Sequence, residues 1–380
     1  MRSVSSAADS EKRAAADPAG AIRDVASDPG VMKPDGAADS GVINLMEVCG
    51  THTMAIAKAG IRQLLPEDVR LISGPGCPVC VTDQSEIDAM LALSELPGVI
   101  ITSYGDMLRV PGSRRGDSLR SRAAAGADVR IVYSPVDAVE IARKEPGKQV
   151  VFLGVGFETT APGTAVAVKL AEEQDVSNFS VFSSLKLVEP ALRALIEAEG
   201  FNVKGFLCPG HVATIIGEKG FRFLPEEYGI PAVISGFEPG DIIRSLNMLL
   251  DQIRGGRAET ENEYTRAVRP EGNPQALAVM EELFEAAESR WRGLGYIEGS
   301  ALALRAEHEL FDAKKRFGLK VPASSEIPGC RCGEVIQGRI SPVECPLFGK
   351  ACLPEDPVGP CMVSSEGACA AAWKYGWEGR

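Results

Sequence analysis

Basic clusters, long apolar runs and a charged-then-apolar N-terminus are all missing from this sequence. Its 380 residues include 40 Lys and Arg against 52 Asp and Glu, a net charge of −12, and the basic residues do not gather anywhere. Because nucleic-acid-binding proteins present a basic face, we expect no nucleic-acid partner. No stretch reaches the roughly 18 apolar residues of a membrane span, so we expect no membrane segment. The missing secretory pattern predicts a cytoplasmic location.

The chain divides into an extension and three expected domains. Residues 1–41 are rich in Ala, Asp, Ser, Gly and Pro, which predicts a disordered N-terminal extension. From Val42 onward, short apolar runs alternate with amphipathic stretches, a pattern typical of βαβ units and parallel sheets. The expected strands are Val42–Val48, Val69–Ser73, Val99–Ser103, Val129–Tyr133, Gln149–Val155, Phe179–Ser183, Lys204–Cys208 and Ala232–Gly236.

These eight strands form two consecutive blocks of four, so the fold class is α/β with two Rossmann-like open parallel-sheet domains. We place these domains at residues 42–146 and 147–239. After Pro239 the strands are expected to stop. Helical periodicity over Gly240–Arg254, Pro274–Arg292 and Ser300–Phe317 predicts a mainly helical third domain, residues 240–380, with a metal-organised end.

Cysteine is plentiful, with ten residues in a chain that shows no export pattern. In a reducing cytoplasm such cysteines more often bind metal or carry out redox chemistry than form structural disulfides. Six of them lie near the C-terminus with one, twelve, six, eight and seven residues between them: Cys330, Cys332, Cys345, Cys352, Cys361 and Cys369. Zinc usually takes paired C-x₂₋₄-C knuckles, which this segment lacks. Irregular spacing favours an iron–sulfur cluster, with zinc, disulfides or inert thiols as alternatives.

The other four cysteines lie in glycine-rich motifs that each follow an expected strand. These motifs are MEVCGTHT with Cys49 and His52, GPGCPVC with Cys77 and Cys80, and CPGHV with Cys208 and His211; a fourth motif, GVGFETT, carries Glu158. Because the carboxyl ends of parallel strands are where open α/β sheets bind ligands, we expect the motifs to converge on one cleft.

Each motif has a plain and a functional interpretation. The CxxC thiols precede an expected helix, whose N-terminus lowers a thiol pKa, so they suit dithiol–disulfide chemistry. Half of a zinc site or a structural pair are the alternatives. His52 and His211, two of only three histidines, are candidate proton donors or orienting groups. Glu158 is either a general base or a cap for the helix that follows it. Cys208 is either exposed in the cleft or buried.

Together these motifs and the tail CRCGEVIQG…CPLFGKACLPEDPVGPCMVSSEGACAA closely resemble the HypD family of hydrogenase maturation factors, from Val42 to the C-terminus. The resemblance implies two Rossmann-like domains and a third domain that holds a 4Fe–4S cluster. It implies assembly of the Fe(CN)₂CO unit of nickel–iron hydrogenase with two partners, a small HypC-type chaperone that shares the iron and a HypE-type protein that supplies cyanide.

The same resemblance assigns roles to single residues. Cys49 would bind the iron, and Cys77 and Cys80 would be the redox pair, with His52, Glu158 and His211 as neighbours. The family spacing of fourteen, six and sixteen intervening residues matches the quartet Cys330, Cys345, Cys352 and Cys369 as cluster ligands, although Cys332 competes with Cys330. Whether such a protein turns over a free substrate stays open. The alternative function is a cluster-dependent thiol–disulfide oxidoreductase, and a third reading is a zinc-stabilised enzyme.

Overall fold

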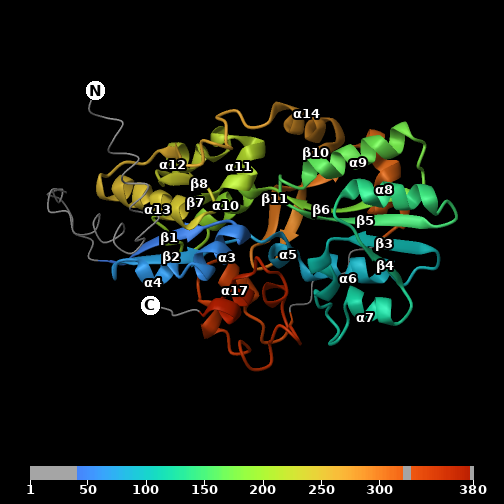
Figure 1. Cartoon of the computed structure of the whole chain (residues 1–380), viewed down its shortest axis with the longest axis horizontal. Coiled ribbons are helices and arrows are strands. Elements are labelled where there is room, and N and C mark those ends of the chain that lie inside the picture. The colour runs from blue at the N-terminus through green and yellow to red at the C-terminus, as the bar shows by residue number, and fades with distance from the viewer. Residues whose placement is uncertain (1–40, 320–326, 377–380) are drawn as a thin grey trace.

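The computed structural model describes residues 41–319 and 327–376 (Figure 1). The predicted N-terminal extension, residues 1–41, lies outside the described residues except for Gly41. Within the described ranges, no helix is both long and apolar enough to cross a bilayer.

Sheet A contains five parallel strands in the order β2-β1-β7-β8-β9. Its core is aliphatic and lies beneath α3 (Gly50–Lys58), α4 (Ile61–Leu64) and α13 (Pro239–Arg254). The order of the strands reverses direction between β1 and β7, which makes that pair the topological switch point. The strands are β1 Ile43–Glu47, β2 Val69–Ser73, β7 Gly205–Pro209, β8 Ala232–Ser235 and β9 Thr260–Asn262.

Sheet B contains six strands in the order β10-β11-β6-β5-β3-β4, with β10 and β11 antiparallel and the others parallel. Its central strands are nearly continuous apolar runs because helices cover them, as Figure 1 shows for α8 (Pro135–Lys144) and α9 (Ala161–Glu173). The strands are β3 Val99–Ser103, β4 Asp128–Ile131, β5 Gln149–Gly156, β6 Phe179–Lys186, β10 Phe284–Trp291 and β11 Gly295–Leu304.

The chain crosses between the sheets three times, so the predicted grouping of the strands is wrong. We expected the first four strands in one sheet and the next four in another. Instead β1 and β2 pair with β7 and β8, while β3 to β6 form the parallel part of sheet B. Residues 42–146 and 147–239 therefore each contribute strands to both sheets. The parallel, doubly wound order of both sheets is nevertheless consistent with the predicted Rossmann-like architecture.

The expectation that strands stop after Pro239 is also wrong. The predicted helix at residues 274–292 ends at Leu283 and continues as β10, and the predicted helix at 300–317 begins inside β11. Between the two strands, Gly293 and Gly295 have φ values of 80° and 78°, which let the hairpin turn. Residues 240–304 therefore do not form part of a mainly helical domain, because they contribute two strands to sheet B.

The remaining elements are short and connect the strands. Several begin at a side-chain cap, such as Asp83 for α6 and the Ser134 capping box for α8. They are α5 Pro78–Val81, α6 Gln84–Leu93, η1 Gly105–Arg109, α7 Leu119–Ala124, α10 Val188–Ile196, α11 Gly210–Ile216, η2 Glu218–Phe221, α12 Phe223–Tyr228, α14 Pro274–Leu283, η3 Ala306–Phe311, α15 Ala313–Arg316, α16 Cys332–Ile336, η4 Pro342–Glu344, η5 Pro360–Met362 and α17 Ala368–Tyr375.

Candidate functional site

Cys49 lies at the switch point of sheet A. It follows β1 and is the N-cap residue of α3, while the neighbouring strand β7 leads into Gly210 and His211 at the start of α11. The Val48 N–H donates to the Leu207 carbonyl oxygen, which fixes the two strand ends side by side (3.2 Å). The position is the one where doubly wound sheets bind ligands.

The CxxC turn contacts Cys49 through backbone. The Gly74 N–H donates to the Glu47 carbonyl oxygen and the Gly50 N–H donates to the Gly76 carbonyl oxygen, each at 2.8 Å. A Cβ on Gly76 would lie 2.5 Å from the Cys49 Cα, so only glycine allows this approach. Cys77 and Cys80 form a disulfide across α5. The Cys49 thiol and the disulfide therefore belong to one continuous backbone assembly.

The far end of the same turn is attached to sheet B. The Arg292 N–H donates to the Val81 carbonyl oxygen at 2.8 Å, and Thr82 forms an isolated β-bridge with Trp291. Trp291 is buried, donates through Nε1 to the Ser300 hydroxyl and stacks on Phe157. The CxxC turn is thus held by both sheets. Trp291 was missed in the sequence because it lay in a segment predicted as helix.

Burial dominates the electrostatics of Cys49. It raises the pKa of the thiol to about 12, although the backbone N–H groups of His52 and Thr51 at the start of α3 work in the opposite direction. The thiol is 7% exposed, and it is protonated at neutral pH in this arrangement. A thiolate there needs a cation, and the helix N–H groups are already placed to stabilise it.

Two carboxylic acids that the sequence analysis did not single out flank Cys49. Glu47 is fully buried; it accepts from the Cys49 N–H at 3.1 Å and from the Thr53 hydroxyl at 2.6 Å, and burial raises its pKa to about 7. Glu366, from the Cys-rich segment, accepts from the Thr51 hydroxyl at 2.8 Å, and burial raises its pKa too. Glu47 lies two residues before Cys49 in MEVC, which was a usable signal. Glu366 gave no comparable signal.

The two candidate histidines stack on the same aromatic ring. His52 is fully buried and stacks on Phe237 with ring centroids 4.7 Å apart, and His211 stacks on Phe237 at 3.8 Å. Burial lowers the pKa of His52 to about 4, so the ring is neutral, and its Nε2–H donates to the Gly236 carbonyl oxygen. The single N–H of His52 is therefore already used, and its role in holding a ligand stays a prediction.

Glu158 lies after β5, at the switch point of sheet B. It does not cap the helix that follows it: its Oε1 accepts from the Val188 N–H at the start of α10 (2.8 Å). Burial raises its pKa to about 7. Its neighbour Phe157 packs on Trp291, which in turn braces the CxxC turn. The Glu158 carboxylate is thus hydrogen-bonded to the connection between β6 and α10. Its role as a general base stays a prediction.

Five of the six C-terminal cysteines line one cavity with Leu347 and Phe348: Cys330, Cys332, Cys345, Cys352 and Cys369. A Cβ on Gly359 would lie 2.7 Å from the Sγ atoms of both Cys330 and Cys332, so glycine keeps this wall open. Within residues 41–319 and 327–376, no three His, Cys, Asp or Glu side chains converge as ligands of a single ion. A 4Fe–4S cluster is larger than a single metal ion and is held by four thiolates placed around it. The cysteines that line this cavity are donors of the type that such a cluster requires.

Cys361, the remaining cysteine, lies between the two sulfur sites. It lines a second small cavity that it shares with Cys77, Cys80 and Glu366. It is fully buried, and hydrogen-bonding to Cys332 and Cys369 is among the causes that shift its pKa. Cys208, by contrast, is a residue of β7 whose side chain is completely buried in the apolar core, and burial raises its pKa. Of the two interpretations left open for Cys208, the structure has it buried.

Two doubly wound sheets, with cysteines at the carboxyl ends of strands of sheet A, define a two-sheet α/β protein with a sulfur-rich centre. A family model described as HypD, hydrogenase formation hypA family, matches residues 33–376. The chain belongs to the HypD family, as the motifs indicated.

Relatives from distant organisms support the same assignment. The chain is similar to the hydrogenase maturation factor HypD of Rhizobium leguminosarum bv. viciae, with 46% identity over 88% of both chains. It is also similar to the HypD of Azotobacter vinelandii, with 47% identity over 87% of this chain and 89% of that one. A putative hydrogenase expression/formation protein of Methanocaldococcus jannaschii is 43% identical over 88% of this chain and 92% of its own length.

Proposed function

We propose that this chain holds iron through Cys49 while the Fe(CN)₂CO unit of nickel–iron hydrogenase is assembled. In this proposal a HypC-type chaperone shares the iron, a HypE-type protein supplies cyanide, and the Cys77–Cys80 pair and a 4Fe–4S cluster provide redox chemistry. The observation that carries the proposal is the backbone contact between Gly76 and Cys49, which brings the candidate iron ligand and the disulfide together at the switch point.

The environment of Cys49 suits a soft, electron-rich iron. Thiolate is the side chain that such iron prefers. Because metal binding requires the thiolate, a proton leaves Cys49 when iron arrives, and the Thr51 and His52 N–H groups stabilise the sulfur charge that forms. The site is buried, which excludes water from ligands bound to the iron.

The disulfide supports a redox role. Its reduction takes two electrons and two protons and yields the Cys77 and Cys80 thiols. Cys80 N–H donates to the Cys77 sulfur at 3.2 Å, so a thiolate at Cys77 would be stabilised by the start of α5. Glu366 is the carboxylic acid that shares a cavity with the pair, and we assign it the role of proton carrier there.

The cysteine-lined cavity supports a cluster site. Cys330, Cys345, Cys352 and Cys369 would hold the cluster, as the family spacing predicts. When bound, a 4Fe–4S cluster supplies or accepts single electrons. Cys332 also lines this cavity and Cys361 lines the one beside it, so these two thiols stand between the cluster ligands and the disulfide.

Infrared spectroscopy tests the proposal directly. The chain is purified after co-expression with HypC- and HypE-type partners, and cyanide and carbonyl stretching bands are expected in the complex. Cys49→Ala should abolish the bands, whereas the control Cys208→Ala, which removes a thiol fully buried within β7, should retain them. Bands that persist in Cys49→Ala would exclude Cys49 as iron ligand. If no sample shows the bands although the disulfide can still be reduced, the thiol–disulfide oxidoreductase would be favoured.

A further inference from the structure

The edge of sheet A at β2 faces an open slot. Parallel pairing with β1 uses alternate residues of the strand: the Ile43 N–H donates to the Asp68 carbonyl oxygen and the Gly74 N–H donates to the Glu47 carbonyl oxygen. Val69, Leu71 and Ser73 therefore direct their backbone groups to the other side. In the part of the chain that the structure describes, β2 is the last strand of sheet A on this side.

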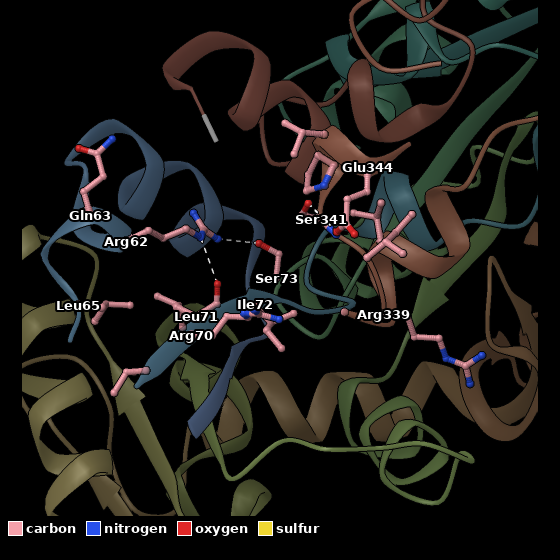
Figure 2. Close-up of a pocket in the computed structure, with 16 residues that line it drawn as sticks. Arg62, Gln63, Leu65, Arg70, Leu71, Ile72, Ser73, Arg339, Ser341 and Glu344 are labelled. Atoms are coloured by element: carbon pink, nitrogen blue, oxygen red, sulfur yellow. Dashed lines mark hydrogen bonds between the residues drawn. The ribbon is translucent and has the colours of Figure 1, made fainter. Parts of the chain in front are cut away.

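The slot has a floor and two walls. The floor is β2, one wall is α4, and the other is the end of α16 with the segment that follows it as far as Glu344, as Figure 2 shows. Gly338 packs directly on the sheet, since a Cβ there would lie 2.5 Å from Ile72 and 2.7 Å from Met46. The walls thus stand on opposite faces of the sheet, and a cavity of about 410 Å³ lies along the strand edge between them. Val69, Leu71 and Ser73 themselves are buried at the bottom of this cavity.

Hydrogen-bonding capacity remains along this edge. Two of its groups are satisfied within the chain: the Val69 N–H donates to Pro66, and Arg62 Nε donates to the Leu71 carbonyl oxygen. The N–H groups of Leu71 and Ser73 lie on the same side and face the slot. Exposed strand edges normally carry a protective feature such as a bulge, a covering helix or a proline. Here the Arg62 side chain covers part of the edge, because it donates to the Ser73 hydroxyl as well as to the Leu71 carbonyl oxygen (Figure 2). The N–H groups of Leu71 and Ser73 are the donors that remain for an added strand.

The slot is positively charged in an acidic protein. Its ionisable lining residues are Arg62, Arg70 and Arg339 against Glu344, whereas the whole chain has a net charge of −12. Arg70 and Arg339 are exposed. Hydrogen bonds from Ser341 lower the pKa of the Glu344 carboxyl, and Arg70 is close enough to lower it further. The local charge therefore favours an anionic occupant, and the row of backbone donors favours a polypeptide over a small anion.

We propose that this slot binds an extended, acidic segment of a partner protein, which pairs with β2 as an added strand. Five residues of β2 span about 16 Å at 3.3 Å per residue, which matches a paired segment of five residues. Its carboxylates would face Arg70 and Arg339. Because β2 leads through Gly74 into the CxxC turn, a segment paired with β2 would run towards the sulfur-rich centre. This binding does not require iron at Cys49.

Synthetic peptides test the proposal with the full chain. The probe is an acetylated, amidated octapeptide of alternating valine and glutamate, and its control carries lysine in place of glutamate. The glutamate peptide should slow amide hydrogen exchange at Leu71 and Ser73 and should bind about tenfold more tightly than the lysine peptide, as expected for two exposed ion pairs. The double variant Arg70→Glu, Arg339→Glu changes only exposed side chains and should reverse this preference.

Four results would overturn the proposal. In the first two, neither peptide slows exchange at Leu71 and Ser73 at millimolar concentration, or both peptides bind equally well to the wild-type chain and to the double variant. In the third, the two amides are protected in the free chain and lose that protection when residues 1–40 are deleted, which would make the chain's own N-terminal segment the occupant. In the fourth, their protection depends on protein concentration, which would make a second copy the occupant.

Discussion

Substituting Gly76 by alanine separates the two halves of the candidate site without touching a sulfur atom. The added Cβ would lie 2.5 Å from the Cys49 Cα and from the Val48 carbonyl carbon, and closer still to the Cys49 nitrogen. All three are backbone atoms at the junction of β1 and α3, so none can rotate away. Carbon atoms that are not bonded pack at about 3.5 Å, so the CxxC loop and Cys49 must separate by roughly 1 Å.

The expected effects on stability and on function differ in size. Forcing an extra methyl group into a packed interior typically costs about 1–3 kcal/mol of the free energy of unfolding. A displacement of about 1 Å between reacting groups costs on the order of 100-fold in rate. Gly76→Ala should therefore fold, with a moderate loss of stability, and should lose most of its hydrogenase maturation.

Two measurements check this prediction against a matched control. Urea unfolding gives the free energy of unfolding, and hydrogenase activity restored in a strain that lacks the corresponding protein gives the rate of maturation. In the control Gly147→Ala, the added Cβ meets nothing within 4 Å, so both quantities should match wild type. If Gly76→Ala behaved like Gly147→Ala in both assays, the contact between the CxxC loop and Cys49 would have no functional meaning.

Three further predictions concern the buried charges and the cysteine-lined cavity. Glu86→Gln should cost about 3–5 kcal/mol, because it leaves the fully buried Lys186 without its carboxylate. Burial alone would raise the pKa of Glu86, but Lys186 and Lys314 lower it to about 2. The ionised Glu86 therefore contributes its full stabilisation above pH 4.5 and loses it as the pH falls towards 2. Urea titrations at several pH values should show this loss in wild type and not in Glu86→Gln. Gly359→Ala should lower the iron and acid-labile sulfide bound per chain, since its Cβ would approach two cysteine sulfurs, and Gly147→Ala should not. Cys345→Ala should lose bound iron and sulfide, whereas Cys361→Ala should retain both, because Cys345 lines the cavity and Cys361 is not among the described residues that line it. Equal iron and sulfide contents in the two variants would refute the assignment of Cys345 as a cluster ligand.

Local structure up to Pro239 could be predicted from the sequence because it depends on local patterns. Apolar runs such as Val99–Ser103 are buried strands whose length and composition suffice to identify them. The hairpin of β10 and β11 could not be found in this way. The segment FEAAESRW is rich in residues that favour helices, and it becomes a strand only because β11 pairs with β6 and β10 pairs with β11.

The partners of each strand were beyond the reach of sequence patterns for a different reason. β1 pairs with β7, and more than 150 residues separate them; no local signal encodes such a pairing. The sequence motifs predicted Cys49, His211 and the CxxC at strand ends, and the structure places them there. The position of Glu366, contributed by the C-terminal segment, follows only from the packing of α17 on α3 and could not have been expected.

The interleaved sheets explain why the CxxC lies where it does. The first crossing of the chain from sheet A to sheet B is the segment that contains Cys77 and Cys80, so its two ends are bonded to different sheets. Gly76 is bonded to the start of α3 on the side of sheet A, and Val81 is bonded to Arg292 on the side of sheet B. The position of the cysteine pair therefore depends on both sheets at once. Had the strands formed two consecutive blocks, as expected, this turn would have been an ordinary loop within one domain. The geometry of the thiol pair is in this sense a property of the whole chain, and substitutions at either end of the turn should act on it.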